Sequence, residues 1–198
     1  MKIKPKQYIV YIGVVGQIAC GKGVLVDYLI KKLGFVSFSL SSILHDELKK
    51  RGIKEFSRKT LQDIGDELRK KYGNDVLAQK ALISLKKRKL EHVVIEGIRN
   101  PAEIDYLKTL PNFILIGVKS RRSLRFQRLL KRAKPWDPKT WKEFLKIDRR
   151  DLGIGQQHSG QQVGKCLAYC DYVLTNNKGV SDFQKKTKKL LDNIFKKS

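Results

Sequence analysis

The fold of this chain follows from one short segment, which reads Gly16-Gln17-Ile18-Ala19-Cys20-Gly21-Lys22-Gly23. An apolar run ends at Gly16, and a helical pattern begins at Gly21. Glycines at these two places let the backbone bend around phosphate groups with its N–H groups pointing inward. The next residue, Lys22, adds a positive charge. The segment therefore predicts a phosphate-binding loop between a strand and a helix, and the alternative is a chance glycine turn.

Short apolar runs alternate with helical patterns on either side of this loop. The apolar runs predict five strands, over residues 8–15, 35–40, 93–98, 113–118 and 172–175. Helical patterns cover residues 21–33, 42–51, 58–72, 74–87, 101–109, 121–134, 139–149, 161–170 and 181–195. This alternation predicts one α/β domain over residues 1–198, with a five-stranded parallel sheet between two layers of helices. In such folds ligands bind beyond the carboxyl ends of the strands.

The composition is strongly basic, with 43 Lys and Arg against 19 Asp and Glu and a net charge of +24. A field of this size attracts nucleic acids, and it also steers small phosphorylated ligands. The basic residues are dispersed, and no nucleic-acid-binding motif accompanies them. We therefore favour a solvated lysine-rich surface on an enzyme with anionic substrates over a nucleic-acid-binding protein.

Cysteine usage and the N-terminal residues bear on the compartment. The three cysteines lack the C-x-x-C spacing of a zinc site, and their odd number argues against a disulfide framework. The apolar run before Gly16 has about eight residues, which is too short to span a membrane. It leads into the glycine segment without the cleavage site of a signal peptide. These features predict a cytoplasmic protein with no membrane partner.

The spacing Gly16-x4-Gly21-Lys22 resembles the Walker A motif of P-loop proteins, and in particular the loop of adenylate kinases. The resemblance implies the P-loop fold with ATP and Mg²⁺ as ligands. A general P-loop has Ser or Thr after the lysine, and adenylate kinases have glycine and then threonine. Here Gly23 and Val24 carry no hydroxyl, so Mg²⁺ would be held through water and the phosphates or by another side chain. The implied ATP contacts, with Lys22 also catalytic, are Gly16, Ala19, Cys20, Gly21, Lys22, Gly23 and Val24.

A second segment, which runs from Val93 to Arg99, ends an apolar strand with an acid, a glycine and an arginine. It is similar to the DG-x-x-R segment of nucleoside monophosphate kinases and to the DGIRN segment of deoxynucleotide-kinase-like proteins. The resemblance implies that Glu96 holds Mg²⁺ through water and that Arg99 clamps a phosphate during transfer. The alternative is a surface turn in which both side chains are solvated. Glu103 comes near the place where adenylate kinases read the acceptor base, and it is either a contact to a base amino group or an exposed helix charge.

Two further segments run from Phe38 to His45 and from Arg58 to Gly73. Together they are similar to the monophosphate-binding arm of dephospho-CoA kinase-like and deoxynucleoside monophosphate kinase-like proteins. The similarity predicts a helical acceptor arm over about residues 41–73. It implies that Arg58 grips the acceptor phosphate, that Gln62 approaches the base or sugar, and that Ser39 belongs to the site. His45 stands where the arm usually has arginine, so it is either a weaker phosphate contact or a partly buried helix histidine.

Four arginines lie on one predicted helical stripe, because they follow one another at steps of four, three and four residues. Like charges at this spacing repel unless an anion lies between them. Arginines above a triphosphate would neutralise the charge of a phosphoryl-transfer transition state. We therefore predict a lid over about residues 121–155, with a solvated or nucleic-acid-binding surface as the alternative. The stripe consists of Arg121, Arg125, Arg128 and Arg132; of these, Arg125 and Arg128 are predicted to be catalytic, and Arg125 also to contact ATP.

Two later segments complete the resemblance to P-loop kinases. Either Arg149 or Arg150 would be a further arginine of the lid. In the nucleotide-kinase fold the loop after the last strand surrounds the adenine of ATP. Residues 176–179 are therefore candidates for this contact, and Asn177 is among them.

The resemblance favours an ATP-dependent kinase that acts on a (deoxy)nucleoside monophosphate, with small-molecule nucleotides as its partners. A dephospho-CoA kinase-like enzyme is an alternative, although that family has an aspartate where this chain has Ser41 or Ser42. A second alternative is a P-loop module that senses nucleotides without turning them over, because both hydroxyls after Lys22 are missing. A nucleic-acid-dependent ATPase rests on charge alone.

Overall fold

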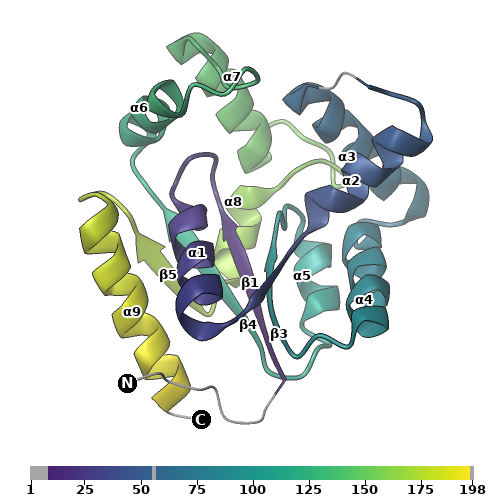
Figure 1. Cartoon of the computed structure of the whole chain (residues 1–198). Coiled ribbons are helices and arrows are strands. Elements are labelled where there is room, and N and C mark those ends of the chain that lie inside the picture. The colour runs from purple at the N-terminus through teal and green to yellow at the C-terminus, as the bar shows by residue number, and fades with distance from the viewer. Residues whose placement is uncertain (1–8, 55–56, 197–198) are drawn as a thin grey trace.

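The computed structural model describes residues 9–54 and 57–196 of the chain. Its centre is a sheet of five parallel strands in the order β2-β3-β1-β4-β5 (Figure 1). All five predicted strands are confirmed; Tyr8, the first residue predicted for β1, lies outside the described residues. The observed strands are β1 (Val10–Gly16), β2 (Val36–Ser39), β3 (His92–Glu96), β4 (Phe113–Lys119) and β5 (Tyr172–Thr175).

The helices follow the predicted pattern with shifts at their ends. Most begin or end within two or three residues of the prediction, but the helix expected over 161–170 is only one turn long. There the chain tightens into a 3-10 turn, η1 (Leu167–Tyr169), because it must extend again to enter β5. The α-helices are α1 (Lys22–Leu33), α2 (Leu40–Lys50), α3 (Arg58–Tyr72), α4 (Val76–Arg88), α5 (Pro101–Leu107), α6 (Arg122–Arg132), α7 (Trp141–Leu152), α8 (Val163–Cys166) and α9 (Val180–Lys196).

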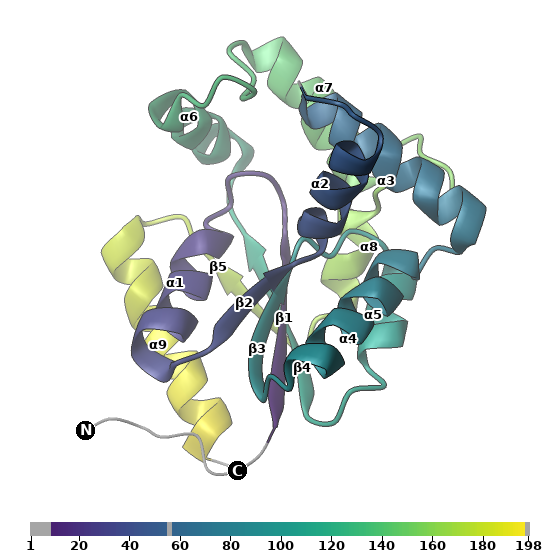
Figure 2. The ribbon, with the colours of Figure 1, turned by 45° about the vertical axis from the view of Figure 1, so that its right-hand side comes forward.

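Alternate residues of β1 pack into two separate cores, one on each face of the sheet. Ile12 and Val14 pack with residues of α1 and α9. Tyr11 and Val15 pack with residues of α4, α5 and α8. Figure 2 shows these helices on opposite faces of the sheet. A strand buried on both faces has to be apolar at every position, which explains the continuous apolar run in the sequence.

Two helical pairs stand above the carboxyl edge of the sheet, where ligands of such folds bind. The pair α2–α3 corresponds to the predicted acceptor arm, and residues 55 and 56 between them lie outside the described residues. The pair α6–α7 corresponds to the predicted lid (Figure 2). A third apolar cluster, formed by Ile18, Leu129 and Phe144, joins the lid to the loop after β1. Among the described helices, none has both the length and the apolar character that a membrane crossing requires.

Candidate active site

The loop between β1 and α1 has the geometry of a phosphate-binding loop. Gly21 has φ +105°, and a Cβ atom there would lie 2.1 Å from Nδ2 of Asn176, so only glycine fits. Ala19 also adopts a left-handed conformation, with φ 55°. The ammonium group of Lys22 donates hydrogen bonds to the carbonyl oxygens of Gly16, at 2.6 Å, and Gln17, at 3.0 Å. Lys22 therefore already lies across the loop where a phosphate would bind.

Side chains from distant segments hold the loop from behind by binding its carbonyl oxygens. Nδ2 of Asn176 donates to the carbonyl of Cys20 at 3.0 Å, and Nη1 of Arg128 donates to the same oxygen at 3.2 Å. Nη1 of Arg125 donates to the carbonyl of Ile18 at 3.3 Å. Because the C=O and N–H of a trans peptide point in opposite directions, these contacts favour a loop whose N–H groups face the phosphate side.

Two of the four arginines in the α6 stripe, Arg125 and Arg132, pair with acids of the lid. Arg125 is only 1% exposed and makes a bidentate pair with the fully buried Asp148, at 2.6 and 3.0 Å. Arg132 pairs in the same way with Asp137, at 2.7 and 2.5 Å. At these two positions carboxylates of the protein balance the charge, whereas the sequence suggested a bound anion for this task. The transfer roles of Arg125 and Arg128 remain predictions.

The predicted adenine contact lies beside the start of the lid. Oδ1 of Asn177 accepts a hydrogen bond from the backbone N–H of Arg121 at 2.9 Å. The hydroxyl of Ser120 donates to the carbonyl of Asn176 at 2.7 Å. The loop after β5 is therefore hydrogen-bonded to the entrance of α6, and Arg128 of α6 also donates to the carbonyl of Asn176 at 2.9 Å.

Glu96 ends β3 between the two neighbouring strands, paired with Val14 of β1 and Ser39 of β2. Its Oε1 atom accepts a hydrogen bond from the Ser37 hydroxyl at 3.0 Å, and Oε2 makes no hydrogen bond to any described residue. Val94, two residues earlier, packs against the face covered by α1. Glu96 therefore points to the same face as the helix that begins at Lys22. No group of three or more metal-binding side chains gathers anywhere in the described residues.

A pocket of about 350 Å³ opens between α2, α3 and the turn after β3. One face of α3 lines it with Arg58, Leu61, Gln62, Gly65 and Arg69, whose spacing is helical. The structure thus brings together four of the six residues predicted to bind the acceptor, namely His45, Arg58, Gln62 and Arg99.

Two further residues of the pocket, Trp136 and Gln161, were missed by the sequence reasoning. They come from the lid segment and from the loop before α8. Trp136 lies between two predicted lid helices and Gln161 at the start of the helix predicted over residues 161–170, and no periodicity shows which residue at such a place returns to a distant pocket.

The pocket has a strongly positive end. Burial lowers the pKa of Arg58, and the positive charge of Arg99 lowers this pKa further. Arg99 pairs with the buried Asp151, while Arg58 lies 4.0 Å from the nearest oxygen of Asp137 and its Nε atom has no hydrogen-bond partner among the described residues. Two guanidinium groups that repel each other in a half-closed pocket favour an anionic ligand between them.

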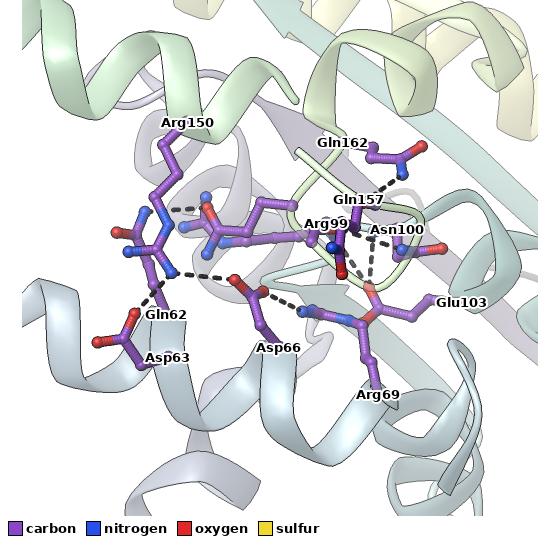
Figure 3. A network of polar contacts seen from close by, with 12 residues as sticks. Gln62, Asp63, Asp66, Arg69, Arg99, Asn100, Glu103, Arg150, Gln157 and Gln162 are labelled. Carbon is purple, nitrogen blue, oxygen red and sulfur yellow. Dashed lines mark hydrogen bonds and ion pairs between the residues drawn. The ribbon is translucent and has the colours of Figure 1, made fainter. Parts of the chain in front are cut away.

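Glu103 and Ser39 lie outside this pocket, contrary to their prediction as substrate contacts. Glu103 is fully buried, so it is also not the exposed charge considered as the alternative. Its Oε2 accepts the backbone N–H groups of Arg99 and Asn100, at 2.7 and 3.1 Å, and its Oε1 accepts Nε and Nη2 of Arg69, at 2.9 and 2.8 Å (Figure 3). These bonds occupy the carboxylate, so Glu103 holds the turn that presents Arg99. The Ser39 hydroxyl pairs with that of Ser41 at 2.9 Å.

Of the two arginines at the end of the lid, Arg150 reaches the acceptor arm and Arg149 is exposed. Nη2 of Arg150 donates to Asp63 at 2.7 Å and to Asp66 at 2.9 Å (Figure 3). Burial alone would lower the pKa of Arg150, but the hydrogen bonds to the two carboxylates outweigh it and raise this pKa. The lid and the acceptor arm are therefore joined by an ion-pair bridge above the pocket.

Three solved structures share this fold. TT1252 from Thermus thermophilus superposes with a TM-score of 0.59 at 20% identity, covering 94% of this chain and 98% of that chain. Shikimate kinase from Acinetobacter baumannii, in complex with shikimate, has a TM-score of 0.57 at 18% identity, with 96% and 95% covered. Dephospho-CoA kinase from Campylobacter jejuni has a TM-score of 0.51 at 20% identity, with 94% and 97% covered. At these identities the likeness shows the P-loop kinase fold alone.

No family model matches the sequence. Two archaeal relatives are more similar. A UPF0200 protein of Methanothermobacter thermautotrophicus is 33% identical over 192 residues, which cover 95% of this chain and 92% of the relative. UPF0200 protein PH1008 of Pyrococcus horikoshii is 32% identical over 187 residues, with 91% and 95% covered. This chain, with its P-loop kinase fold, therefore belongs to the UPF0200 family.

Proposed function

We propose that this protein is an ATP-dependent phosphotransferase that moves the γ-phosphate of ATP to the phosphate of a (deoxy)nucleoside monophosphate. One observation carries the proposal: a pocket of about 350 Å³, with Arg58 and Arg99 at its positive end, opens above the same sheet edge as the phosphate loop. A kinase needs a donor site and an acceptor site side by side. A nucleotide sensor needs only the first.

On the donor side, ATP binds to the N–H groups of the loop and to Lys22. The ammonium group exchanges its bonds to the carbonyls of Gly16 and Gln17 for phosphate oxygens. Arg128 and Asn176 keep the loop carbonyls turned away, so the loop does not have to reorganise when charge builds up. Asn177 lies on the side where the adenine would sit.

On the acceptor side, Arg58 and Arg99 bind the phosphate of the monophosphate. A phosphate is already ionised at neutral pH, so its attack requires positioning and charge neutralisation but no protein base. A hydroxyl acceptor such as that of dephospho-CoA would require a base, and the residues at the expected place are Ser41 and Ser42. The Ser42 hydroxyl donates to the carbonyl of Ser39 at 2.7 Å, which is a structural contact. A phosphate acceptor therefore fits the site better.

Glu96 and Ser37 fit a water-mediated Mg²⁺ site. Mg²⁺ prefers oxygen ligands and keeps several of its waters, and Oε2 of Glu96 is free of hydrogen bonds to the described residues. This pair supplies the side-chain oxygens that Gly23 and Val24 cannot. When bound, the ion neutralises charge on the β- and γ-phosphates. The three free thiols fit a reducing compartment such as the cytoplasm.

A coupled assay with ATP–Mg²⁺ and a panel of nucleoside monophosphates, deoxynucleoside monophosphates and dephospho-CoA tests the proposal. We expect transfer to the monophosphates. Lys22→Ala should lower turnover by about a hundredfold or more, and Arg58→Ala should raise the acceptor KM with little change in the KM for ATP. Lys59→Ala, an exposed neighbour on α3, is the matched control.

Three outcomes would contradict the proposal. Transfer only to dephospho-CoA would move the enzyme to the hydroxyl-acceptor class. ATP binding without transfer to any acceptor at high enzyme concentration would indicate a nucleotide sensor. An Arg58→Ala variant that changed only the KM for ATP would refute the acceptor arm.

A further inference from the structure

Two buried amide side chains face each other in the acceptor pocket. Gln62 comes from α3 and Gln161 from the loop before α8, 99 residues later, and both line the pocket. They are 6% and 5% exposed. Nε2 of Gln62 donates a hydrogen bond to Oε1 of Gln161 at 3.1 Å.

This bond leaves one acceptor and one donor atom unused. Oε1 of Gln62 and Nε2 of Gln161 have no hydrogen-bond partner among the described residues, and neither is among the polar atoms sealed off from solvent. These two atoms are therefore open to the pocket, where their hydrogen-bonding capacity is unused by the protein. Since both residues line the pocket, a ligand can supply the missing partners.

Nothing in the described part of the chain sets the orientation of either amide. The neighbouring Gln162 is different, because its Nε2 donates to the carbonyls of Gln157 and His158 at 3.1 and 3.2 Å (Figure 3). If the amides of Gln62 and Gln161 both turn over, Gln161 becomes the donor in their mutual bond. The amide oxygen and nitrogen have nearly the same size and shape, so both arrangements pack equally well. In each arrangement one donor and one acceptor remain for a ligand, in reversed order.

The rest of the pocket suits a flat heterocycle attached to an anion. Leu44, Leu61 and Trp136 form apolar walls, and Arg58 and Arg99 form the positive end. The volume of about 350 Å³ lies in the range of pockets for small ligands. Nucleobases present a donor and an acceptor on adjacent atoms of one edge. Adenine and cytosine present an amino donor beside a ring acceptor, whereas uracil and thymine present a carbonyl acceptor beside a ring N–H.

We propose that Gln62 and Gln161 form a reversible amide pair that reads the base edge of the acceptor and accepts amino bases and keto bases alike. The inference rests on the proposed function, because it takes the pocket as the site of a nucleoside monophosphate. One arrangement of the pair matches an amino base, and the other matches a keto base. The trans secondary amides of a pantetheine arm point N–H and C=O in opposite directions, so they match the pair less well.

Binding measured without ATP tests this inference independently of turnover. Trp136 lines the pocket, and Trp141→Phe makes it the sole tryptophan, so its fluorescence reports acceptor binding. The probes are AMP, CMP, UMP and dTMP, with dephospho-CoA as the competing ligand. We expect the four monophosphates to bind with Kd values within about tenfold of one another. A preference of a hundredfold or more for one class of base, or binding of dephospho-CoA alone, would overturn the inference.

Gln62→Glu and Gln161→Glu should each create a preference between amino bases and keto bases, and the two variants should prefer opposite classes. A carboxylate only accepts hydrogen bonds, and a bond to a charged group is about twice as strong as a neutral one. The class of base with a donor facing the new carboxylate therefore binds more tightly relative to the other class. Because positions 62 and 161 face different atoms of the base, the favoured class differs between the two variants. We expect the amino-to-keto ratio of Kd values to shift by roughly tenfold or more in each variant, at pH 8, where a carboxylate near Arg58 and Arg99 is ionised.

Gln157→Glu, on the same loop but exposed and outside the pocket, is the matched control and should leave the ratio unchanged. A new negative charge weakens the binding of every monophosphate by a similar factor, and this factor cancels in the amino-to-keto ratio of Kd values. Two variants on different elements keep the test informative if one of them fails to fold. Ratios that shift in the same direction, or not at all, would overturn the inference even if transfer is observed. Base-indifferent binding with the expected shifts but without transfer would support it and would refute the kinase activity.

Discussion

The substitution Asp148→Asn probes the ion pair that joins the lid to the phosphate loop. Asp148 is fully buried and accepts hydrogen bonds from Nη1 and Nη2 of Arg125, at 2.6 and 3.0 Å, and from Nε of Arg122, at 2.9 Å. Arg125 is 1% exposed; without the carboxylate it keeps the carbonyls of Ser120 and Ile18 and the Phe144 ring at 5.3 Å, and the new amide oxygen can accept one bond, but none of these carries a negative charge. The substitution therefore leaves a buried guanidinium without a counter-ion.

Removing one partner of a buried ion pair costs about 3–5 kcal/mol. This is a large part of the roughly 5–15 kcal/mol by which a domain is stable. For a chain of this length it corresponds to a decrease in Tm of about 6–20 °C. Because Arg125 also donates to the loop carbonyl of Ile18, we expect weaker ATP binding as well.

Urea denaturation followed by two probes measures the effect. Both tryptophans, Trp136 and Trp141, lie in the lid segment, so their fluorescence reports the lid, and far-UV circular dichroism reports the whole chain. The matched control is Glu67→Gln, which removes an equally bidentate pair with Arg51 on the exposed surface. Water screens that pair, so the urea midpoint of the Glu67→Gln variant should be close to that of the unmodified protein. A loss below about 1 kcal/mol for Asp148→Asn, on both probes, would refute the reasoning.

Two further predictions concern the phosphate loop and the thiols. Gly21→Ala should weaken ATP binding by tenfold or more in a nucleotide titration, because its Cβ would lie 2.1 Å from the Asn176 amide at φ +105°; unchanged affinity would contradict the loop geometry. Burial raises the pKa of Cys170 to about 12, so little reactive thiolate forms at pH 8, and alkylation should be slow in the native protein, faster with rising pH, and at least tenfold faster in urea. Equal native and unfolded labelling rates at pH 8 would show that this thiol is not protected.

Arginines and lysines occupy different parts of the molecule. Arginines 58, 69, 99, 125, 132 and 150 lie beside carboxylates in the arm and lid. Most lysines are exposed on the outer faces of the helices. The high net charge therefore comes mainly from exposed lysines, while most arginines of the arm and lid have carboxylate partners and the Arg58–Arg99 end of the pocket keeps its positive charge.

The sequence by itself determined the features that depend on local chain properties. Apolar runs of strand length, glycines where the backbone turns, and the residue at each helix start are read within a few neighbours, and they predicted the five strands and the phosphate loop. The four-residue spacing of Arg58 and Gln62 likewise puts both on one face of α3, because four residues make about one helical turn.

Only the tertiary structure decided which partners these residues meet. It buried Glu103 under the turn that carries Arg99, placed Asp148 against Arg125, and brought Gln161 to Gln62 across 99 residues of sequence. These contacts depend on how the lid, the arm and the loop before α8 pack above the sheet. A periodic pattern specifies which face of one element is buried, but not the distant side chain that will lie against it.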